Sequence, residues 1–339
     1  MRDRQGHRMP VVVGVGELLW DILPQGKRPG GAPANFVFHC AQLGADAYLA
    51  SSLGDDDLGN EMRDLLAHQG FKLDFVTTSR ELPTSTVSVS LDQDQNPHYR
   101  ITENVAWDEI PWSDGLGDLS RMADAVCFGS LAQRSSLTRQ TLHRFLACAG
   151  PECLRVFDVN LRLPYPDFAV LLDSIEKANV VKLNADELEY VGNPLGLTGD
   201  THHRLAQIVR RFDLICIALT RGAHGSILVT SDETVECPGQ EILVRDTVGA
   251  GDAFTAGMVM GLLQKRPLHE VNTMAECVAA CVCSQAGAMA RLSPDVTGSF
   301  GVCGHPVREY RRSRQNREKT GEFEAQSRVV GEPSQAQER

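Results

Sequence analysis

The sequence predicts a three-layer α/β/α fold built on a mostly parallel sheet, with a small β-sheet lid. From about residue 11 to 300, short apolar runs rich in β-branched residues alternate with longer amphipathic stretches. Such runs are typical of strands buried on both faces, and strand-helix alternation places helices on both sides of a parallel sheet. Residues 84–102 differ, because apolar and polar residues alternate there around the polar turn DQDQNP. This two-residue period predicts an antiparallel hairpin with one solvated face.

The regular elements can be placed by their patterns. Buried strands are expected at residues 11–17, 123–130, 154–160, 178–184 and 214–220. Helical patterns occupy residues 35–45, 58–70, 138–150 and 201–212. Together they predict one domain that spans residues 10–300.

The hairpin at 84–102 and strands around residues 17–33 are expected to form the small sheet. A sheet inserted in an α/β domain can be a decoration, a dimerisation surface or a lid over a site, and we favour the lid. Past about residue 304 the chain is polar and rich in Arg, Glu and Gln. Residues 305–339 are therefore predicted to be a disordered polar tail outside the fold.

Composition excludes several classes of partner. The 339-residue chain is 42% hydrophobic and 23% charged, with a net charge of −11, which does not suit a broad nucleic-acid-binding surface or a polybasic membrane contact. No apolar run approaches the ~20 residues that span a bilayer. The apolar stretch after the basic N-terminus is too short and too glycine-broken for a signal peptide, so we expect a cytoplasmic protein. Ten scattered cysteines without C-x-x-C spacing indicate free thiols packed in the core.

Polar residues stand at the carboxyl ends of three predicted strands. They are Asp158 and Asn160, Asn184, and Thr220. In open parallel sheets, ligands bind outside the carboxyl ends of the strands. Each residue could also serve as a helix cap, but several together favour a binding site.

A glycine-rich turn marks the start of a late apolar helix. Gly249, Ala250 and Gly251 precede Asp252 within residues 244–263. Such a turn points unpaired N–H groups and the positive end of the helix dipole at one spot, which favours a phosphate. Asp252 alone would be an ordinary carboxylate in a first helical turn.

The surrounding motif is more specific. D-T-x-G-A-G-D at residues 246–252 closely resembles the C-terminal signature of the ribokinase-like (PfkB) carbohydrate kinases. Residues 30–45, GGAPANFVFHCAQLGA, resemble the family's glycine-rich first signature, and SSLGDDDLG follows at residues 51–59.

Two further motifs complete the resemblance, in the family's order over nearly 300 residues. KLNADE supplies the N-x-x-E pattern as Asn184 and Glu187. TRGAHG fits the T-x-G-x-x-G nucleotide loop through Thr220, Gly222 and Gly225.

The resemblance implies an ATP-dependent sugar kinase and a role for each motif. Asp252 would be the general base that takes the proton of the attacking hydroxyl. The backbone N–H groups of Gly249, Ala250 and Gly251 would form the anion hole for the transferring phosphate.

The nucleotide and its metal would lie at the neighbouring strand ends. Asn184 and Glu187 would hold a hydrated Mg²⁺ ion, because Mg²⁺ keeps several of its waters. The nucleotide-binding set implied by the resemblance is Asn184, Thr220, Arg221, Gly222 and Gly225.

Sugar recognition would come mainly from the N-terminal part. Asp21 matches the family's acidic residue that accepts hydrogen bonds from two sugar hydroxyls. Gly30, Gly31 and Asn35 match the sugar-contacting stretch, and Arg162 resembles an arginine that faces the site.

The resemblance also implies a monovalent cation, such as K⁺, beside the anion hole. Asp246 and residues 286–290 stand at the matching positions, although main-chain carbonyls usually supply most ligands there. A homodimer formed through the lid sheet is a further expectation of the same kind.

Rival functions lack their motifs. A dinucleotide-binding oxidoreductase needs G-x-G-x-x-G after the first strand, but Gly14 and Gly16 are followed by Glu17 with no third glycine in register. There is no P-loop, H-E-x-x-H or G-x-S-x-G motif. A non-catalytic sugar or nucleotide sensor of the same fold stays open.

The substrate is less constrained than the reaction. The opening GELLWDILP and the GGAPAN stretch look more like fructokinases than like ribokinase or adenosine kinase. Fructose is therefore the favoured sugar. Because 2-keto-3-deoxygluconate kinases share both features, a keto-sugar acid, another small sugar or a nucleoside is the alternative. Residues 103–112, ENVAWDEIPW, match no pattern that we can interpret.

Overall fold

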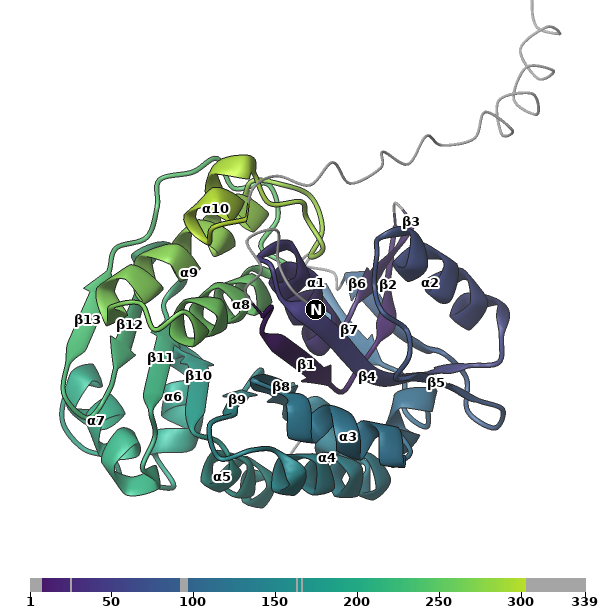
Figure 1. Ribbon diagram of the computed structural model, residues 1–339, viewed down its shortest axis with the longest axis horizontal. Helices are drawn as coiled ribbons and strands as arrows, with labels where there is room; N and C mark the ends of the chain where they lie inside the picture. The colour runs from purple at the N-terminus through teal and green to yellow at the C-terminus, as the bar shows by residue number, and fades with distance from the viewer. Residues whose placement is uncertain (1–7, 25, 92–96, 163, 166, 303–339) are drawn as a thin grey trace, which may run out of the picture. The chain divides into compact units, whose positions relative to one another are not determined.

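The computed structural model describes residues 8–302, except for residues 25, 92–96, 163 and 166 (Figure 1). Within the described range, side chains are described for all residues except 89–99. The predicted tail at 305–339 and most of the hairpin turn therefore lie outside the described residues. Within the described part, no helix is long and apolar enough to cross a membrane.

The described residues form one large sheet and one small one. The order of strands in the large sheet is β13-β12-β11-β10-β9-β8-β1-β4-β5. Neighbours from β11 to β5 are parallel, whereas β12 is antiparallel to both β11 and β13. The bounds are β1 Val11–Val15, β4 Asp46–Gly54, β5 Val76–Ser79, β8 Ala125–Gly129, β9 Leu154–Asp158, β10 Val180–Asn184, β11 Cys216–Thr220, β12 Ser226–Val229 and β13 Thr234–Cys237.

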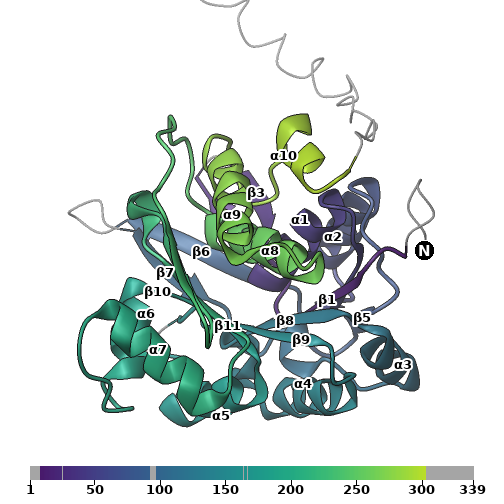
Figure 2. The same cartoon turned by 60° about the vertical axis from the view of Figure 1, so that its left-hand side comes forward.

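Helices cover both faces of the large sheet, which confirms the predicted three-layer fold. On one face lie α1 (Ala32–Gln42), α8 (Ala250–Leu263) and α9 (Leu268–Cys283), with α2 (Asp57–His68) and α10 (Pro294–Ser299) nearby (Figure 2). On the other face lie α3 (Asp114–Met122), α4 (Ser136–Cys148), α5 (Phe168–Lys177), α6 (Ala185–Gly192) and α7 (Thr201–Phe212).

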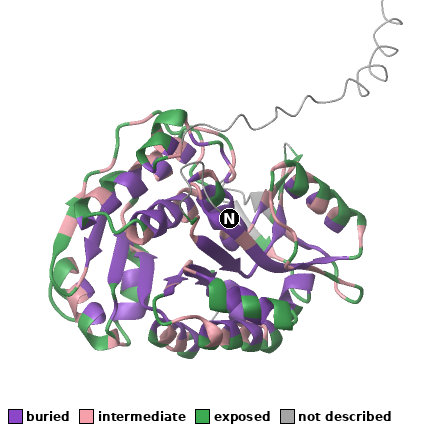
Figure 3. Cartoon of the chain, in the orientation of Figure 1, coloured by how far each residue is buried: buried purple, intermediate pink, exposed green. Residues whose placement is uncertain are grey.

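Alternation of side chains along the strands produces two cores. Val12 and Val180 join the core under α1, α8 and α9, while Val11, Val13 and Val181 join the core over α3–α7. Successive residues of a strand point to opposite faces, so a run that is apolar throughout serves both cores. Figure 3 shows the resulting buried sheet between helices whose outer faces are exposed.

The small sheet has the strand order β3-β2-β6-β7. Its strands are β2 Leu19–Leu23, β3 Gly26–Gly30, β6 Ser85–Leu91 and β7 Pro97–Ile101. The predicted hairpin is present, because β6 and β7 are antiparallel with Val87 opposite Ile101. It joins the earlier hairpin through a parallel pairing of β2 with β6, so the small separate sheet is confirmed.

Residues 103–112, which the sequence left uninterpreted, lie against β4, β5 and α4 of the main body, next to Ile101 at the end of β7. They include the 3₁₀ turn η1 (Ala106–Glu109), whose Trp107 is fully buried. Arg134, at the end of the 3₁₀ turn η2 (Leu131–Arg134), lies 4.1 Å from the Trp107 ring centroid. Its guanidinium donates to both oxygens of Asp108 at 2.8 Å and to the Thr102 carbonyl at 2.8 Å. The segment therefore anchors the end of β7 to the main body.

Replacing Gly14 with alanine should destabilise the fold. A Cβ at Gly14 would lie 2.7 Å from both the Pro33 carbonyl oxygen and Val37 Cγ2. Because one of these atoms is backbone, α1 would have to move away from β1, and overpacking of this kind costs about 1–3 kcal/mol. Urea unfolding followed by circular dichroism measures the change. Gly150→Ala is the matched control, since nothing lies within 4 Å of a Cβ there, and equal midpoints for the two variants would contradict the close packing.

Candidate active site

Asp252 lies in the first turn of α8, directly opposite α1. Its Oδ2 accepts a 2.8 Å hydrogen bond from the Asn35 side-chain amide. The structure thus brings together two residues that are 217 positions apart in the chain. α8 begins after Gly249, whose φ of 79° is left-handed, and no side chain caps this helix start. Ala250 N donates to the Thr247 carbonyl at 3.3 Å, and the first turn can offer its remaining N–H groups to a ligand, as the sequence predicts for a phosphate.

Close packing requires glycine at position 249, where α8 begins, and favours it at position 251. A Cβ at Gly249 would lie 2.5 Å from Ala288 Cβ, and one at Gly251 would lie 3.0 Å from the Lys182 ammonium nitrogen. Ala250 stands between them as the first residue of the helix. The turn is held between the 286–290 loop and β10.

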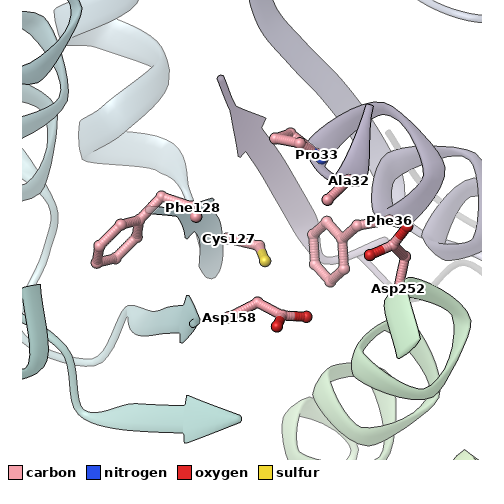
Figure 4. A pocket seen from close by; sticks show the side chains of 8 residues that line it. Ala32, Pro33, Phe36, Cys127, Phe128, Asp158 and Asp252 are labelled. Atoms are coloured by element: carbon pink, nitrogen blue, oxygen red, sulfur yellow. The ribbon is translucent and has the colours of Figure 1, made fainter. Parts of the chain in front are cut away.

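The pKa of the Asp252 carboxyl is raised to about 7. Burial is the main cause, and the negative charge of Asp158 adds to it, whereas Asn35, Lys182 and Arg162 oppose the shift. Figure 4 shows Asp252 and Asp158 at one small pocket between α1, β8, β9 and α8. The pocket is otherwise lined by apolar or small residues, namely Ala32, Pro33, Phe36, Cys127, Phe128 and Gly129. Solvation of a negative charge is poor in such surroundings.

A buried ion pair that the sequence reasoning missed lies beneath the helix start. The Lys182 ammonium is 3.0 Å from Asp158 Oδ1, and both side chains are under 10% exposed. Thr255, one turn into α8, donates to Asp158 Oδ2 at 2.9 Å. Burial lowers the pKa of Lys182, but the charges of Asp158, Glu187 and Asp252 raise it further, so the net shift is upward. The signal was available, because Lys182 interrupts the apolar run VVKLN.

The predicted sugar residues cluster at the junction of the small sheet with α1. Asp21 on β2 faces the end of β3, where a Cβ at Gly30 would lie 2.5 Å from Asp21 Oδ2. Gly31 has φ of 114°, and a Cβ there would be 2.3 Å from the Glu17 carbonyl oxygen. Burial raises the pKa of Asp21 to about 6, against the opposing charge of Arg162.

Glu17 is a second residue that the sequence reasoning did not place in the site. It is 3% exposed, and its Oε2 atom has no hydrogen-bond partner among the described residues. Burial raises its pKa, while N–H groups of Glu17 and Ala32 and the charge of Arg162 lower it. The exposed Arg162 therefore lies within electrostatic reach of three carboxyls, those of Glu17, Asp21 and Asp252.

Asn184 and Glu187 form a capping box at the start of α6. Asn184 Oδ1 accepts from Glu187 N at 2.9 Å, and Glu187 Oε2 accepts from Asn184 N at 2.8 Å. Glu187 Oε1 also accepts from Leu161 N at 2.8 Å. Each oxygen keeps a free lone pair, so the pair suits contact with a magnesium ion through its waters better than direct ligation.

The predicted nucleotide residues continue along the same sheet edge. Thr220 pairs with Asn184 at the ends of β11 and β10. Arg221 follows and donates to Glu236 Oε2 at 3.3 Å. Gly222 and Gly225 have φ of 57° and 79°, and a Cβ at Gly225 would lie 2.0 Å from the Cys237 carbonyl oxygen.

Asp246 lies at the turn before α8, and its carboxylate is surrounded by donors. Oδ1 accepts from Val248 N at 3.1 Å, and Oδ2 accepts from Gly287 N at 2.9 Å. The guanidinium of Arg28, on β3, is 3.2 Å from Oδ2. Hydrogen-bond donors surround this carboxylate, whereas a monovalent cation would need further oxygen acceptors. The surroundings of Asp246 are therefore a poor fit to a monovalent cation site.

A mostly parallel sheet, a glycine-rich helix start at its carboxyl edge and a small second sheet are the features of the ribokinase-like fold. Residues 24–295 match the model of the pfkB family of carbohydrate kinases. The chain is 27% identical over 299 residues to a fructokinase of Salmonella typhimurium, covering 82% of this chain and 94% of the relative. It is 28% identical over 309 residues to an aminoimidazole riboside kinase of the same species, covering 84% and 93%.

A solved structure has the same fold. An uncharacterized sugar kinase from Pyrococcus horikoshii in complex with ATP superposes with a TM-score of 0.72 at 26% identity, covering 85% of this chain and 99% of that one. The chain belongs to the pfkB family of carbohydrate kinases.

Asp252→Asn should stabilise the protein at high pH. The folded pKa, about 7, exceeds the ordinary value of 3.8, so ionising the folded state is penalised. That penalty is absent below about pH 4 and complete above about pH 7. Because solvent reaches part of the carboxyl, we expect a gain of about 1–2 kcal/mol at pH 8 that vanishes near pH 4.

Urea unfolding at pH 4, 6 and 8 measures this difference. Asp232→Asn, in an exposed surface turn, is the control and should match the parent at every pH. A gain for Asp252→Asn that did not depend on pH would contradict the raised pKa.

Proposed function

We propose that this pfkB-family kinase transfers the γ-phosphoryl group of ATP to a hydroxymethyl group of a small sugar, with fructose preferred and Asp252 as general base. The observation that carries the proposal is the Asp252 carboxyl, held by Asn35 at 2.8 Å with a pKa of about 7. A base of that pKa accepts a proton far more readily than an ordinary aspartate and is still substantially ionised at neutral pH.

The transfer uses the surroundings of Asp252. As the sugar oxygen bonds to the γ-phosphorus and the bond to the ADP oxygen breaks, the hydroxyl proton passes to Asp252. N–H groups of Gly249, Ala250 and Gly251 and the positive end of α8 stabilise the charge on the transferring group. Lys182, in contact range of Gly251, adds a buried positive charge beneath them.

The nucleotide would lie along the ends of β10 and β11. Thr220, Arg221, Gly222 and Gly225 would line it, with glycines that let backbone approach the ligand. Mg²⁺ bound to the ATP phosphates supplies charge neutralisation. Asn184 and Glu187 would hold the waters of that ion, using oxygen lone pairs that the capping box leaves free.

The charges near the sugar residues favour a neutral substrate. Asp21, Glu17 and Asp252 all lie within electrostatic reach of Arg162, and Glu17 lies within reach of Arg134 as well. The carboxylate of a keto-sugar acid would meet any of these carboxyls that is ionised as a like charge. Asp21 would accept hydrogen bonds from sugar hydroxyls, and Gly30, Gly31 and Asn35 would complete the contact. The fructokinase relative supports fructose, while the aminoimidazole riboside kinase relative supports testing a riboside.

The proposed setting is the cytoplasm, where ATP is available. Dimerisation through the small sheet belongs to the same proposal, since its amphipathic strands could pair with those of a second copy.

A substrate panel tests the proposed function. With ATP and Mg²⁺, ADP release is measured by chromatography for fructose, ribose, 2-keto-3-deoxygluconate, adenosine and aminoimidazole riboside. We expect kcat/KM for fructose to exceed the others by at least about tenfold, and Asp252→Asn to lower kcat by about 10²–10⁴-fold as expected for loss of a general base. Preference for another sugar would overturn the choice of fructose. Unchanged turnover by Asp252→Asn would overturn the base assignment, and no turnover with any sugar would favour a sensor.

Neighbouring charges should move the pH profile in opposite directions. Asp158 raises and Lys182 lowers the pKa of Asp252, and the base must be ionised, so kcat rises with pH through about 7. Asp158→Asn should shift that rise to lower pH, and Lys182→Met should shift it to higher pH. Breaking the buried pair will also destabilise the fold, so melting curves must first show that each variant is folded at the assay temperature. Shifts of the same sign in both variants would contradict the electrostatic coupling.

A further inference from the structure

A guanidinium from the small sheet reaches the loop that supports the helix start. Arg28 on β3 pairs with Asp246 at 3.2 Å, although the two residues are 218 positions apart. Its side chain also lies over Gly287, where a Cβ would be 3.5 Å from Nη1 and 3.6 Å from Cδ. Gly287, with φ of 87°, gives the arginine room to approach the main chain.

The neighbouring carbonyls are engaged by helix α1. The Ala288 carbonyl lies 2.9 Å from His39 Nε2, and the Ala290 carbonyl accepts from the Gln42 amide at 3.2 Å. Burial lowers the pKa of His39 to about 4, so its ring is neutral at physiological pH. A neutral ring that faces a carbonyl oxygen must present its N–H there, which makes His39 a donor.

Three side chains thus supply donors where a bound cation would need acceptors. Asp246 receives two backbone N–H groups and Arg28, while Ala288 and Ala290 receive His39 and Gln42. A monovalent cation in a protein is held by oxygen lone pairs, and N–H dipoles pointed at the same oxygens compete with it. Asp246 Oδ2 already accepts two donors, Gly287 N and Arg28, and the positive charge of Arg28 would repel a second cation at that oxygen. With Arg28 in place, the residues present do not fit the cation.

We propose that Arg28 takes the place of a monovalent cation in this chain and is a positioning residue for the anion hole. Its guanidinium neutralises Asp246 and fixes the 286–290 loop, with His39 and Gln42 holding the two carbonyls. Ala288 in turn packs directly against Gly249, the residue at which α8 begins. The kinase therefore works without K⁺, and the small sheet is tied to the phosphate-binding turn through one ion pair.

The inference rests on the proposed anion hole, but it predicts a stability effect that needs no substrate. In the parent protein, the melting temperature should be the same in KCl and in choline chloride at equal ionic strength. Arg28→Ala removes the guanidinium and frees a lone pair of Asp246 Oδ2, so this variant should melt at a lower temperature in choline and be stabilised by KCl. Arg28→Lys keeps the charge and should behave like the parent protein. Lys27→Ala, which removes the adjacent cation paired with Glu61 instead, is the matched control and should show no specific response to K⁺.

Activity gives the second readout, with the preferred sugar of the panel and chromatographic detection of ADP, since coupling enzymes can need K⁺ themselves. The parent protein should keep its kcat within about twofold between the two salts. Arg28→Ala should lose about tenfold in kcat in choline, with a smaller change in the KM for sugar, and should recover in KCl. Such a loss corresponds to a misplaced transition-state contact rather than weaker ground-state binding.

Two results would overturn the proposal. One is a parent protein that needs K⁺ for stability or for kcat, and the other is an Arg28→Ala variant that matches the parent protein in both salts. If no sugar in the panel is turned over, the proposed function fails, yet the melting comparison still decides the role of Arg28.

Discussion

The candidate active site at the carboxyl edge of the sheet depends on a buried ion pair between a lysine on β10 and an aspartate on β9. Lys182 and Asp158 are 3.0 Å apart and almost without solvent contact. Removing both charges from water is costly, and such pairs often add little to stability. The ion pair is better explained by its contacts with the start of α8 and its effect on Asp252 than by a contribution to stability. Lys182 lies against Gly251, Thr255 ties Asp158 to α8, and both charges act on Asp252.

The carboxyls near this pair share one property. Glu17, Asp21, Glu187 and Asp252 all have raised pKa values, and burial is the main cause for each. Groups of this kind weaken the folded state as they ionise. Arg162, Arg134 and Lys182 supply the positive charges that act on these carboxyls. Raised pKa values clustered in this way are typical of a functional site.

Short-range sequence patterns predicted the helices and strands, because these depend mainly on neighbouring residues. The apolar runs predicted the strands of the parallel sheet, and their polar last residues, such as Asn184 and Thr220, indicated which edge to propose for binding. Lys182 was missed because a charge inside an apolar run does not reveal which residue across the sheet will pair with it. The contact of Arg28 with Asp246 spans 218 residues, and no periodicity carries that information. Family motifs supplied the proposed roles of Asp252 and Asp21. Glu17 became visible only through its buried, unpartnered oxygen, and Arg134 only through its contacts with Asp108 and Thr102.

The small sheet has a mechanical consequence that follows from its parallel pairing of β2 with β6. Its strands belong to two separate chain segments, so four crossings connect it to the main body, and three of them are held firmly. Gly31 packs on the Glu17 backbone, Thr84 is bonded to Asp56 and to Gly54 N, and Arg134 holds the Thr102 carbonyl. A sheet held at several connections is more restricted than a loop held at one. Any change in the position of the small sheet would have to involve all of these short segments together.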